Sequence, residues 1–255
     1  MRYVRLNGTA PVGRLLPWAA SAEELIATQV RLGHASPDGW HPRRQPSSVA
    51  ACFVCFRRGR SGPGEAGDAG WAAAVFLIHE RLADAVVAQG PAGGPYQPGL
   101  LALREGPLLE EAVRRLAGVP EVLLVNATGR DHPRRAGLAL HLGARLGVPT
   151  IGITSRTLVA TGAWPEDRAG ARSPLLLADT PEPVVVGYWV RPRAGVRPLA
   201  VHAAWRTDAA TAASVVWDLM RAARTPEPLR QARRLAREAR ARDARAELCA
   251  DGRAR

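Results

Sequence analysis

Two periods of hydrophobic patterning divide the chain into strand-like and helix-like parts. Residues 49–56 form an apolar run, and after a glycine-rich turn the segments 71–79 and 82–89 form two more, which predicts an antiparallel meander. Apolar residues then recur at helical spacing over 108–116. The short, wholly apolar run 122–125 is typical of a central strand covered on both faces.

The flanking segments add further predicted elements. Ser21 followed by Glu24 predicts a capping box at the start of a helix over residues 21–32. A proline-rich excursion after residue 153 is expected to be irregular. The other predicted elements are a helix over 134–146, strands over 148–153, 184–190 and 198–203, and a helix capped by Thr207 or Asp208 that runs to about residue 221.

This order of elements predicts one α/β domain. A meander followed by alternating helices and strands indicates a mixed sheet with helices on both faces, which we place at residues 47–224. Residues 1–46 are expected to be an N-terminal extension with one helix. Residues 225–255, rich in arginine and alanine, are either a solvated helix with i,i+4 charge pairs or an arm that grips phosphates, and both interpretations stay open.

The charge favours a polyanionic partner. The net charge is +12 and the pI about 11.2, and every positive side chain is arginine because the chain has no lysine. Such a balance favours nucleic acid. The absence of a long apolar run argues against a membrane span, and residues 1–13 show no secretory signal. We therefore expect a cytoplasmic monomer.

The cysteines do not suggest a metal or redox site. Cys52 and Cys55 have C-x-x-C spacing, but they lie inside an apolar strand without turn residues between them, and no second ligand pair accompanies them. With Cys249 the count is odd, which fits a reducing compartment. We interpret Cys52 and Cys55 as buried strand residues.

Four segments carry a resemblance to a known family. Residues 95–107 (PYQPGLLALREGP) are similar to the P-Y-I-P-G-x-L-x-F-R-E segment of endonuclease V, and residues 125–143 (VNATGRDHPRRAGLALHLG) to its V-D-G-x-G-x-x-H-P-R-R-x-G-x-A-x-H-x-G. Residues 148–152 match its V-P-T-I-G, and residues 226–228 its P-E-P. Since these blocks keep their order and spacing, the chain is identified as a member of the endonuclease V superfamily.

The resemblance implies a ribonuclease H-like fold and a metal-dependent activity. The family cuts DNA or RNA near a deaminated base, chiefly inosine, using Mg²⁺. Magnesium needs hard oxygen ligands, and hydrolysis needs the metal to neutralise developing charge. The family supplies an aspartate on the first strand, the glutamate of F-R-E, the aspartate of V-D-G and a late histidine.

This chain departs from that ligand set. The glutamate is kept as Glu105, but Asn126 replaces the V-D-G aspartate, and gap-free placement of I-A-G-x-D-x-S-F on residues 49–56 puts Phe53 at the strand aspartate. The histidine position falls on Trp205. One carboxylate and one amide make a poor magnesium site, and we expect Phe53 and Trp205 to add apolar bulk there. A shifted register, or Asp131 reaching in from its loop, are the ways in which a ligand set can be restored.

The segments that bind nucleic acid in the family match this sequence better than the metal ligands do. In the family the P-Y-I-P turn is a wedge whose tyrosine stacks where a base is extruded, and Pro95, Tyr96, Pro98 and Gly99 preserve it, with Gln97 in place of isoleucine. Tyr96 can also be a simple turn residue that packs on its prolines.

The family's base pocket uses backbone groups around the G-x-G turn. Gly129 remains here, but the first glycine is Ala127, whose methyl group is expected to narrow or close the pocket. His132, Arg134 and Arg135 keep the phosphate side, and Arg156 lies beside the position of a family lysine. Arginines at a helix start are unfavourable for the helix dipole, which favours an anion there. His132 can alternatively cap the next helix.

Three functions remain open from the sequence. The first is an endonuclease V-like protein that binds single-stranded or mismatched DNA or RNA, with hydrolysis lost or strongly impaired. The second is an active Mg²⁺-dependent nuclease of DNA repair or of inosine-containing RNA. The third is a scaffold for a nucleoside-like small molecule or a protein partner. His141, in the A-x-H-x-G segment, is expected to be packed and hydrogen-bonded.

Overall fold

The structure is a computed structural model that describes residues 17–57, 63–178, 182–220 and 223–251. Within these ranges, eight strands form one mixed sheet in the order β3-β2-β1-β4-β5-β8-β7-β6. The strands are β1 (Ser48–Phe56), β2 (Ala69–Ile78), β3 (Arg81–Pro91), β4 (Val122–Val125), β5 (Thr150–Thr154), β6 (Arg172–Leu177), β7 (Val184–Val190) and β8 (Leu199–Ala203). The helices are α1 (Ala22–Gly33), α2 (Leu101–Arg114), α3 (Leu138–Leu146), α4 (Ala209–Leu219) and α5 (Glu227–Asp251).

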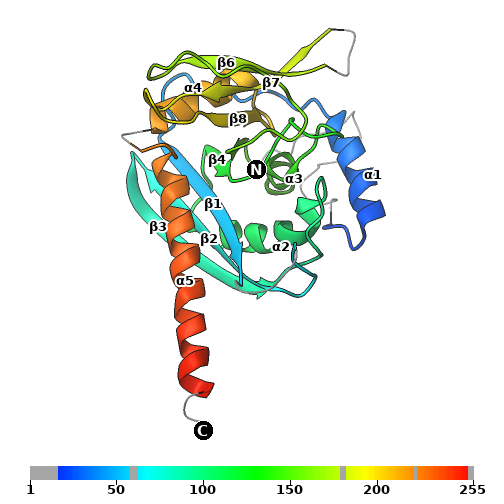
Figure 1. Ribbon diagram of the computed structural model, residues 1–255, viewed down its shortest axis with the longest axis vertical. Coiled ribbons are helices and arrows are strands. Elements are labelled where there is room, and N and C mark those ends of the chain that lie inside the picture. The colour runs from blue at the N-terminus through cyan, green and yellow to red at the C-terminus, as the bar shows by residue number, and fades with distance from the viewer. Residues whose placement is uncertain (1–16, 58–62, 179–181, 221–222, 252–255) are drawn as a thin grey trace.

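The sheet is covered on both faces, which confirms the predicted α/β architecture (Figure 1). The cluster beneath α1, α2 and α3 includes Cys52 and Val125, whereas the cluster beneath α4 and α5 includes Ala51 and Leu124. Successive side chains of a strand point to opposite faces, so Phe53 packs against the second cluster. The buried state of Cys52 and Cys55 in β1 is also as predicted.

Helix α5 packs across β1 and β2 and continues beyond the sheet (Figure 1). Its buried residues recur every three or four positions, at Leu229, Ala232, Ala236 and Ala239. Small side chains let the helix approach the sheet closely. The first half of the predicted tail is therefore part of the domain core.

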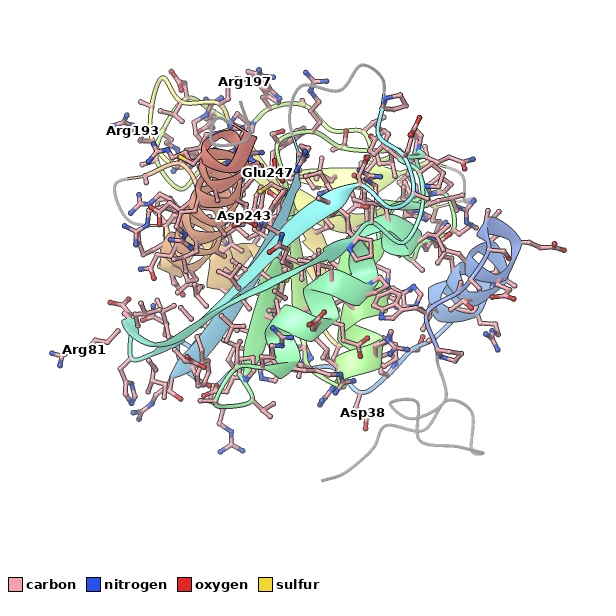
Figure 2. All side chains as sticks on the ribbon, turned by 90° about the horizontal axis from the view of Figure 1, so that it is seen from below. Asp38, Arg81, Arg193, Arg197, Asp243 and Glu247 are labelled. Atoms are coloured by element: carbon pink, nitrogen blue, oxygen red, sulfur yellow. The ribbon has the colours of Figure 1, made fainter. Side chains whose placement is uncertain are left out.

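Acidic residues hold the outer half of α5 to the sheet. Asp243 accepts a hydrogen bond of 2.7 Å from the Trp71 indole on β2, and Glu247 pairs with Arg57 after β1. Both acids lie on the side of α5 that faces these strands (Figure 2). Arg240 also donates to the Phe56 carbonyl at 3.1 Å, whereas Arg242 and Arg245 are exposed to solvent.

Two elements differ from the sequence prediction. The helix expected over 134–146 begins only at Leu138, because Arg135 has a left-handed φ of 54° and Gly137 is extended. Arg134 and Arg135 thus precede the helix, and the inference from the helix dipole is wrong. The proline-rich excursion contains β6, an edge strand in which Pro174 is tolerated because only one side of the strand is paired.

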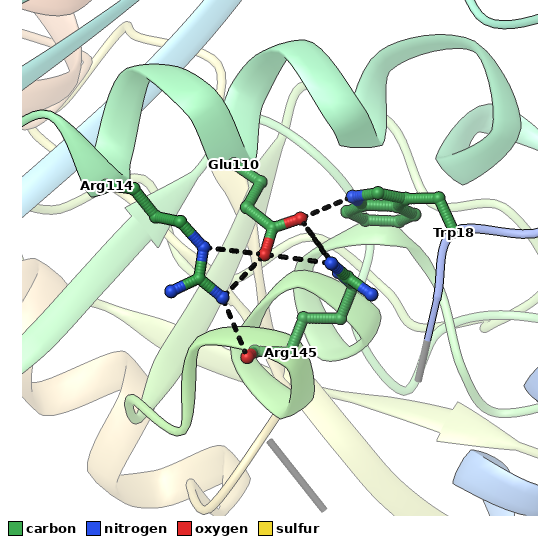
Figure 3. A network of polar contacts seen from close by, with 4 residues as sticks. All are labelled: Trp18, Glu110, Arg114 and Arg145. Carbon is green, nitrogen blue, oxygen red and sulfur yellow. Dashed lines mark hydrogen bonds and ion pairs between the residues drawn. The ribbon is translucent and has the colours of Figure 1, made fainter. Parts of the chain in front are cut away.

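The N-terminal extension is attached to the domain by a capped helix and a buried polar network. Ser21 caps α1 by accepting the N–H of Glu24 at 3.2 Å, as predicted. Before it, the Trp18 indole donates to Glu110 of α2, whose carboxylate also pairs with Arg114 and with Arg145 of α3 (Figure 3). The network therefore joins the extension to two helices of the domain.

We expect Glu110→Gln to lower the free energy of unfolding by about 2 kcal/mol, since the uncharged amide has a single acceptor oxygen for the largely buried Arg145 and the half-exposed Arg114. Denaturant titration followed by tryptophan fluorescence measures this change. Glu111→Gln is the matched control, because its ion pair with Arg115 is exposed and should be worth less than about 1 kcal/mol. Equal effects of the two variants would contradict the stabilising role of the network.

His141 departs from its predicted environment in one respect. Its ring is buried against Trp18, with 4.6 Å between the ring centroids, so the predicted packing is confirmed. Neither ring nitrogen has a hydrogen-bond partner, however, so the prediction of a satisfied histidine is wrong. Burial and the nearby Arg145 lower the pKa of His141 to about 4, which keeps the ring neutral.

Among the described residues, no helix is long and apolar enough to cross a membrane.

Candidate nucleic-acid interface

A small cavity lies at the carboxyl ends of the parallel strands β4 and β5. Its volume is about 160 Å³, below the roughly 300–1,000 Å³ of pockets that enclose drug-sized ligands, so it suits a single ring system. We call it the base pocket. Its lining is Gln29, Tyr96, Gln97, Pro98, Gly99, Leu101, Asn126, Ala127, Thr128, His132, Leu138, Thr154 and Leu158.

The structure brings together part of the predicted binding set. The tip of the 95–99 turn, Asn126, Ala127 and His132 line the base pocket, whereas Arg135 and Arg156 do not. Ala127 lines an open pocket, so its methyl group does not close the pocket. Gly129 serves packing, because a Cβ there would lie 2.1 Å from the carbonyl oxygen of Ala203.

The wedge turn is held at one carbonyl group. Gly99 has a left-handed φ of 77°, and its oxygen accepts hydrogen bonds of 3.0 Å from Gln29 Nε2, His132 Nε2 and Arg134 Nη2. These donors come from α1 and from the turn before α3. Tyr96, 46% exposed, projects from this anchored turn. The turn therefore presents an aromatic ring to solvent on a fixed backbone.

His132 and Arg134 are used within the protein. Burial lowers the pKa of His132 to about 4, and the hydrogen bond to Gly99 opposes this only in part. The neutral ring donates through Nε2 and accepts the N–H of Arg134 at Nδ1, 3.2 Å away. Arg134 also donates to Gln29 Oε1 at 2.7 Å. Both side chains therefore bind the carbonyl group of the 95–99 turn.

A buried polar group behind the pocket escaped the sequence analysis. Thr154 Oγ1, which lines the pocket, lies 2.8 Å from His202 Nε2, and His202 Nδ1 lies 3.6 Å from Asp131. Asp131 accepts the N–H groups of Leu158, Val159 and Ala160 at 2.7 to 2.8 Å. The available signal was a histidine in the otherwise apolar β8.

Asp131 is therefore unavailable as a substitute metal ligand. Its side chain is fully buried, and both oxygens are occupied by backbone donors of the 158–160 loop. It shapes the pocket through Leu158, which is part of the lining.

Glu105 stands apart as an unpaired acid. It lies one helical turn after Leu101, which lines the pocket, and no hydrogen bond or ion pair engages its carboxylate among the described residues. Burial raises the pKa of Glu105 to about 8, although the charge of Arg104 opposes the shift. Arg104 itself turns away and pairs with Asp68 at 2.8 Å.

The other positions implied as metal ligands hold side chains that carry no ligand atom or are already engaged. Phe53 packs on the α5 side of the sheet, where the guanidinium of Arg233 lies 5.2 Å from its ring. The side-chain oxygen of Asn126 accepts a hydrogen bond of 3.1 Å from Arg233. Cys52, the strand neighbour of Phe53, faces the other cluster, and burial together with the negative charge of Glu105 raises the pKa of its thiol.

Trp205 lies in the core beneath α3, where its backbone N–H donates to Thr150 Oγ1 at 3.1 Å. Trp205 does not line the base pocket. One isolated carboxylate and an amide oxygen bound to a guanidinium do not fit a magnesium ion, which requires several oxygen ligands. Within the described residues, no group of three or more His, Cys, Asp or Glu side chains could hold a metal.

Comparison with known proteins identifies the family. The family model of endonuclease V matches residues 44–234. The chain belongs to the endonuclease V family. It is 41% identical over 214 residues to endonuclease V of Methanopyrus kandleri, covering 83% of each chain, and 42% identical over 158 residues to that of Nocardia farcinica, covering 61% of this chain and 67% of the relative.

Solved endonuclease V structures share the fold. The protein from Streptomyces avermitilis is 31% identical with a TM-score of 0.77, over 89% of this chain and 96% of that one. Endonuclease V of Ciona intestinalis, in complex with a 24mer DNA that contains an inosine followed by a ribo-adenosine, is 22% identical with a TM-score of 0.69, over 85% and 95%. The predicted ribonuclease H-like fold is thereby confirmed.

Proposed function

We propose that this endonuclease V family member binds nucleic acid at an extruded base and has lost, or nearly lost, metal-dependent hydrolysis. The observation that carries the proposal is the base pocket beside the anchored 95–99 turn, together with implied ligand positions of which Glu105 alone is a carboxylate. The net charge of +12 supports a polyanionic ligand.

The pocket supports recognition of a single base. Asn126, Thr128 and Thr154 offer polar groups among apolar walls, and Tyr96 provides a stacking surface at the entrance. Extrusion costs least from a single strand or a mismatch. We therefore propose single-stranded or mismatched DNA or RNA as the substrate class, by analogy with the inosine-containing DNA bound by the Ciona relative.

The electrostatics of the site support the proposed loss of catalysis. In-line hydrolysis of a phosphodiester needs positive charge that is placed against the reacting oxygens by a metal clamp. Among the implied ligand positions Glu105 alone is a carboxylate, whereas Phe53 offers an aromatic ring and Asn126 an amide oxygen already bound by Arg233. Removing groups that stabilise a transition state lowers rates by orders of magnitude.

Tyr96→Ala is expected to weaken binding of a single-stranded oligonucleotide with one inosine about tenfold, because base stacking on an aromatic ring contributes about 1–3 kcal/mol. Fluorescence anisotropy at low salt measures the affinity. Tyr96→Phe keeps the ring and should bind within about twofold of the wild type. An unchanged affinity in Tyr96→Ala would show that Tyr96 is only a turn residue and does not stack on a base.

The same titration separates a polymer ligand from a small one. Wild-type protein should bind the oligonucleotide far more tightly than free inosine, because the phosphates contribute most of the affinity. Absence of oligonucleotide binding at low salt would refute the proposed function. Tight binding of free inosine alone would favour a nucleoside-binding scaffold.

A further inference from the structure

Two arginines of α5 surround the position that aligns with the family's strand aspartate. The guanidinium carbons of Arg233 and Arg237 lie 5.2 and 5.8 Å from the centroid of the Phe53 ring. Arg233 also donates to Asn126 Oδ1 at 3.1 Å. Arg233 therefore bridges the two positions where the family pattern has carboxylates and this chain has none.

Neither arginine has a carboxylate partner in the described part of the chain. Other arginines of α5 do: Arg230 pairs with Glu227, and Arg234 approaches Glu238. Burial, with the nearby charges of Arg237 and Arg224, lowers the pKa of Arg233. The Nε of Arg233 is buried without an acceptor. Like charges gathered without counterions are unfavourable unless an anion joins them.

The aromatic ring at position 53 explains how this charge stays available. An aromatic face attracts a guanidinium without neutralising it and leaves the N–H groups at its edge free to donate. An aspartate there would form an ion pair with Arg233 instead. The exchange of the carboxylate for phenylalanine thus removes a metal ligand and leaves the positive charge of Arg233 without an ion pair.

Resting on the proposed function, we infer that Arg233 and Arg237 form a phosphodiester-binding site beside the base pocket, with Arg233 supplying the positive charge that a metal supplies in active relatives. Asn126 connects the two sites, since it lines the pocket and holds Arg233. A nucleotide whose base enters the pocket would place a neighbouring phosphate at the arginines. Guanidinium groups suit this ligand because their N–H fork matches phosphate oxygens.

The test compares Arg233→Gln with Arg234→Gln, a matched loss of one charge on an exposed side of the same helix. Binding of an inosine-containing single strand is measured in EDTA over a series of salt concentrations. We expect wild-type binding to be the same in EDTA and in Mg²⁺. Arg233→Gln should weaken it at least tenfold and reduce the salt slope by about 0.7, the value of one phosphate contact on a single strand. Arg234→Gln should stay within threefold.

An abasic oligonucleotide separates the phosphate site from the base pocket. Arg233→Gln should weaken binding of the abasic strand as well, whereas Tyr96→Ala should not. Phe53→Asp gives an independent variant should Arg233→Gln fold poorly, because the new carboxylate should neutralise Arg233 and weaken binding to a similar extent. If the wild type binds but Arg233→Gln and Phe53→Asp match Arg234→Gln, the inference is overturned while the proposed function stands. If the wild type binds no strand, the proposed function itself fails.

Discussion

Asp131→Asn is expected to lower the free energy of unfolding by about 4 kcal/mol. The carboxylate is fully buried and receives three backbone N–H groups from the 158–160 loop. Asparagine has one side-chain oxygen, and its NH2 group would face a backbone N–H where the second carboxylate oxygen had been. At least one buried N–H therefore loses its acceptor. Chemical denaturation at neutral pH gives the difference directly.

Asp38→Asn is the control for this variant, because Asp38 lies at the surface (Figure 2) and its substitution should change stability by less than about 0.5 kcal/mol. The same loop contributes Leu158 to the base pocket. Asp131→Asn should therefore also weaken binding of the inosine strand. A stability equal to that of Asp38→Asn would show that the loop does not depend on this carboxylate.

Glu105→Gln is expected to stabilise the protein at alkaline pH. The folded-state pKa is raised from 4.5 to about 8 by burial, so the unfolded state releases its proton first. The stability that protonated Glu105 allows is complete below pH 4.5, falls as the pH rises through about 8, and is fully lost above that. A shift of this size corresponds to at most about 5 kcal/mol, and partial solvent contact reduces our expectation to about 3 kcal/mol.

The measurement is a pair of denaturation curves in EDTA at pH 5 and pH 9, with a further wild-type curve in Mg²⁺ at pH 9. Glu105→Gln should match the wild type at pH 5 and exceed it at pH 9. Glu111→Gln, a change at an exposed carboxylate, controls for the loss of one negative charge. A wild type that gains as much stability from Mg²⁺ at pH 9 as it gains from the substitution would show that Glu105 holds a cation.

Local signals predicted most of the fold. The capping box at Ser21 and the apolar run of β4 depend on neighbouring residues and were found where expected. β6 was missed because Pro174 opposes a strand unless the strand lies at the edge of a sheet, which is a property of the tertiary arrangement. The start of α3 was misplaced because Arg135 adopts a left-handed conformation that is uncommon for residues other than glycine.

In the site, too, local motifs were readable from sequence whereas tertiary contacts were not. The wedge at Tyr96 and the loss of the aspartate at Asn126 are readable from short motifs. The partner of Asn126 is not, because Arg233 lies 107 residues away on a helix whose docking on the sheet brings it there. Likewise, the motif that contains His132 and Arg134 does not reveal that both bind the Gly99 carbonyl. Sequence identified the residues, and packing decided their roles.

The most direct test of the account is a titration of the wild type with Mn²⁺, followed by electron paramagnetic resonance in the presence of an inosine-containing strand, with cleavage of the strand monitored in the same samples. The account predicts a bound strand, no saturable Mn²⁺ site that depends on Glu105, and an intact strand. A single tight Mn²⁺ site that disappears in Glu105→Gln, together with cleavage that disappears with it, would contradict the account.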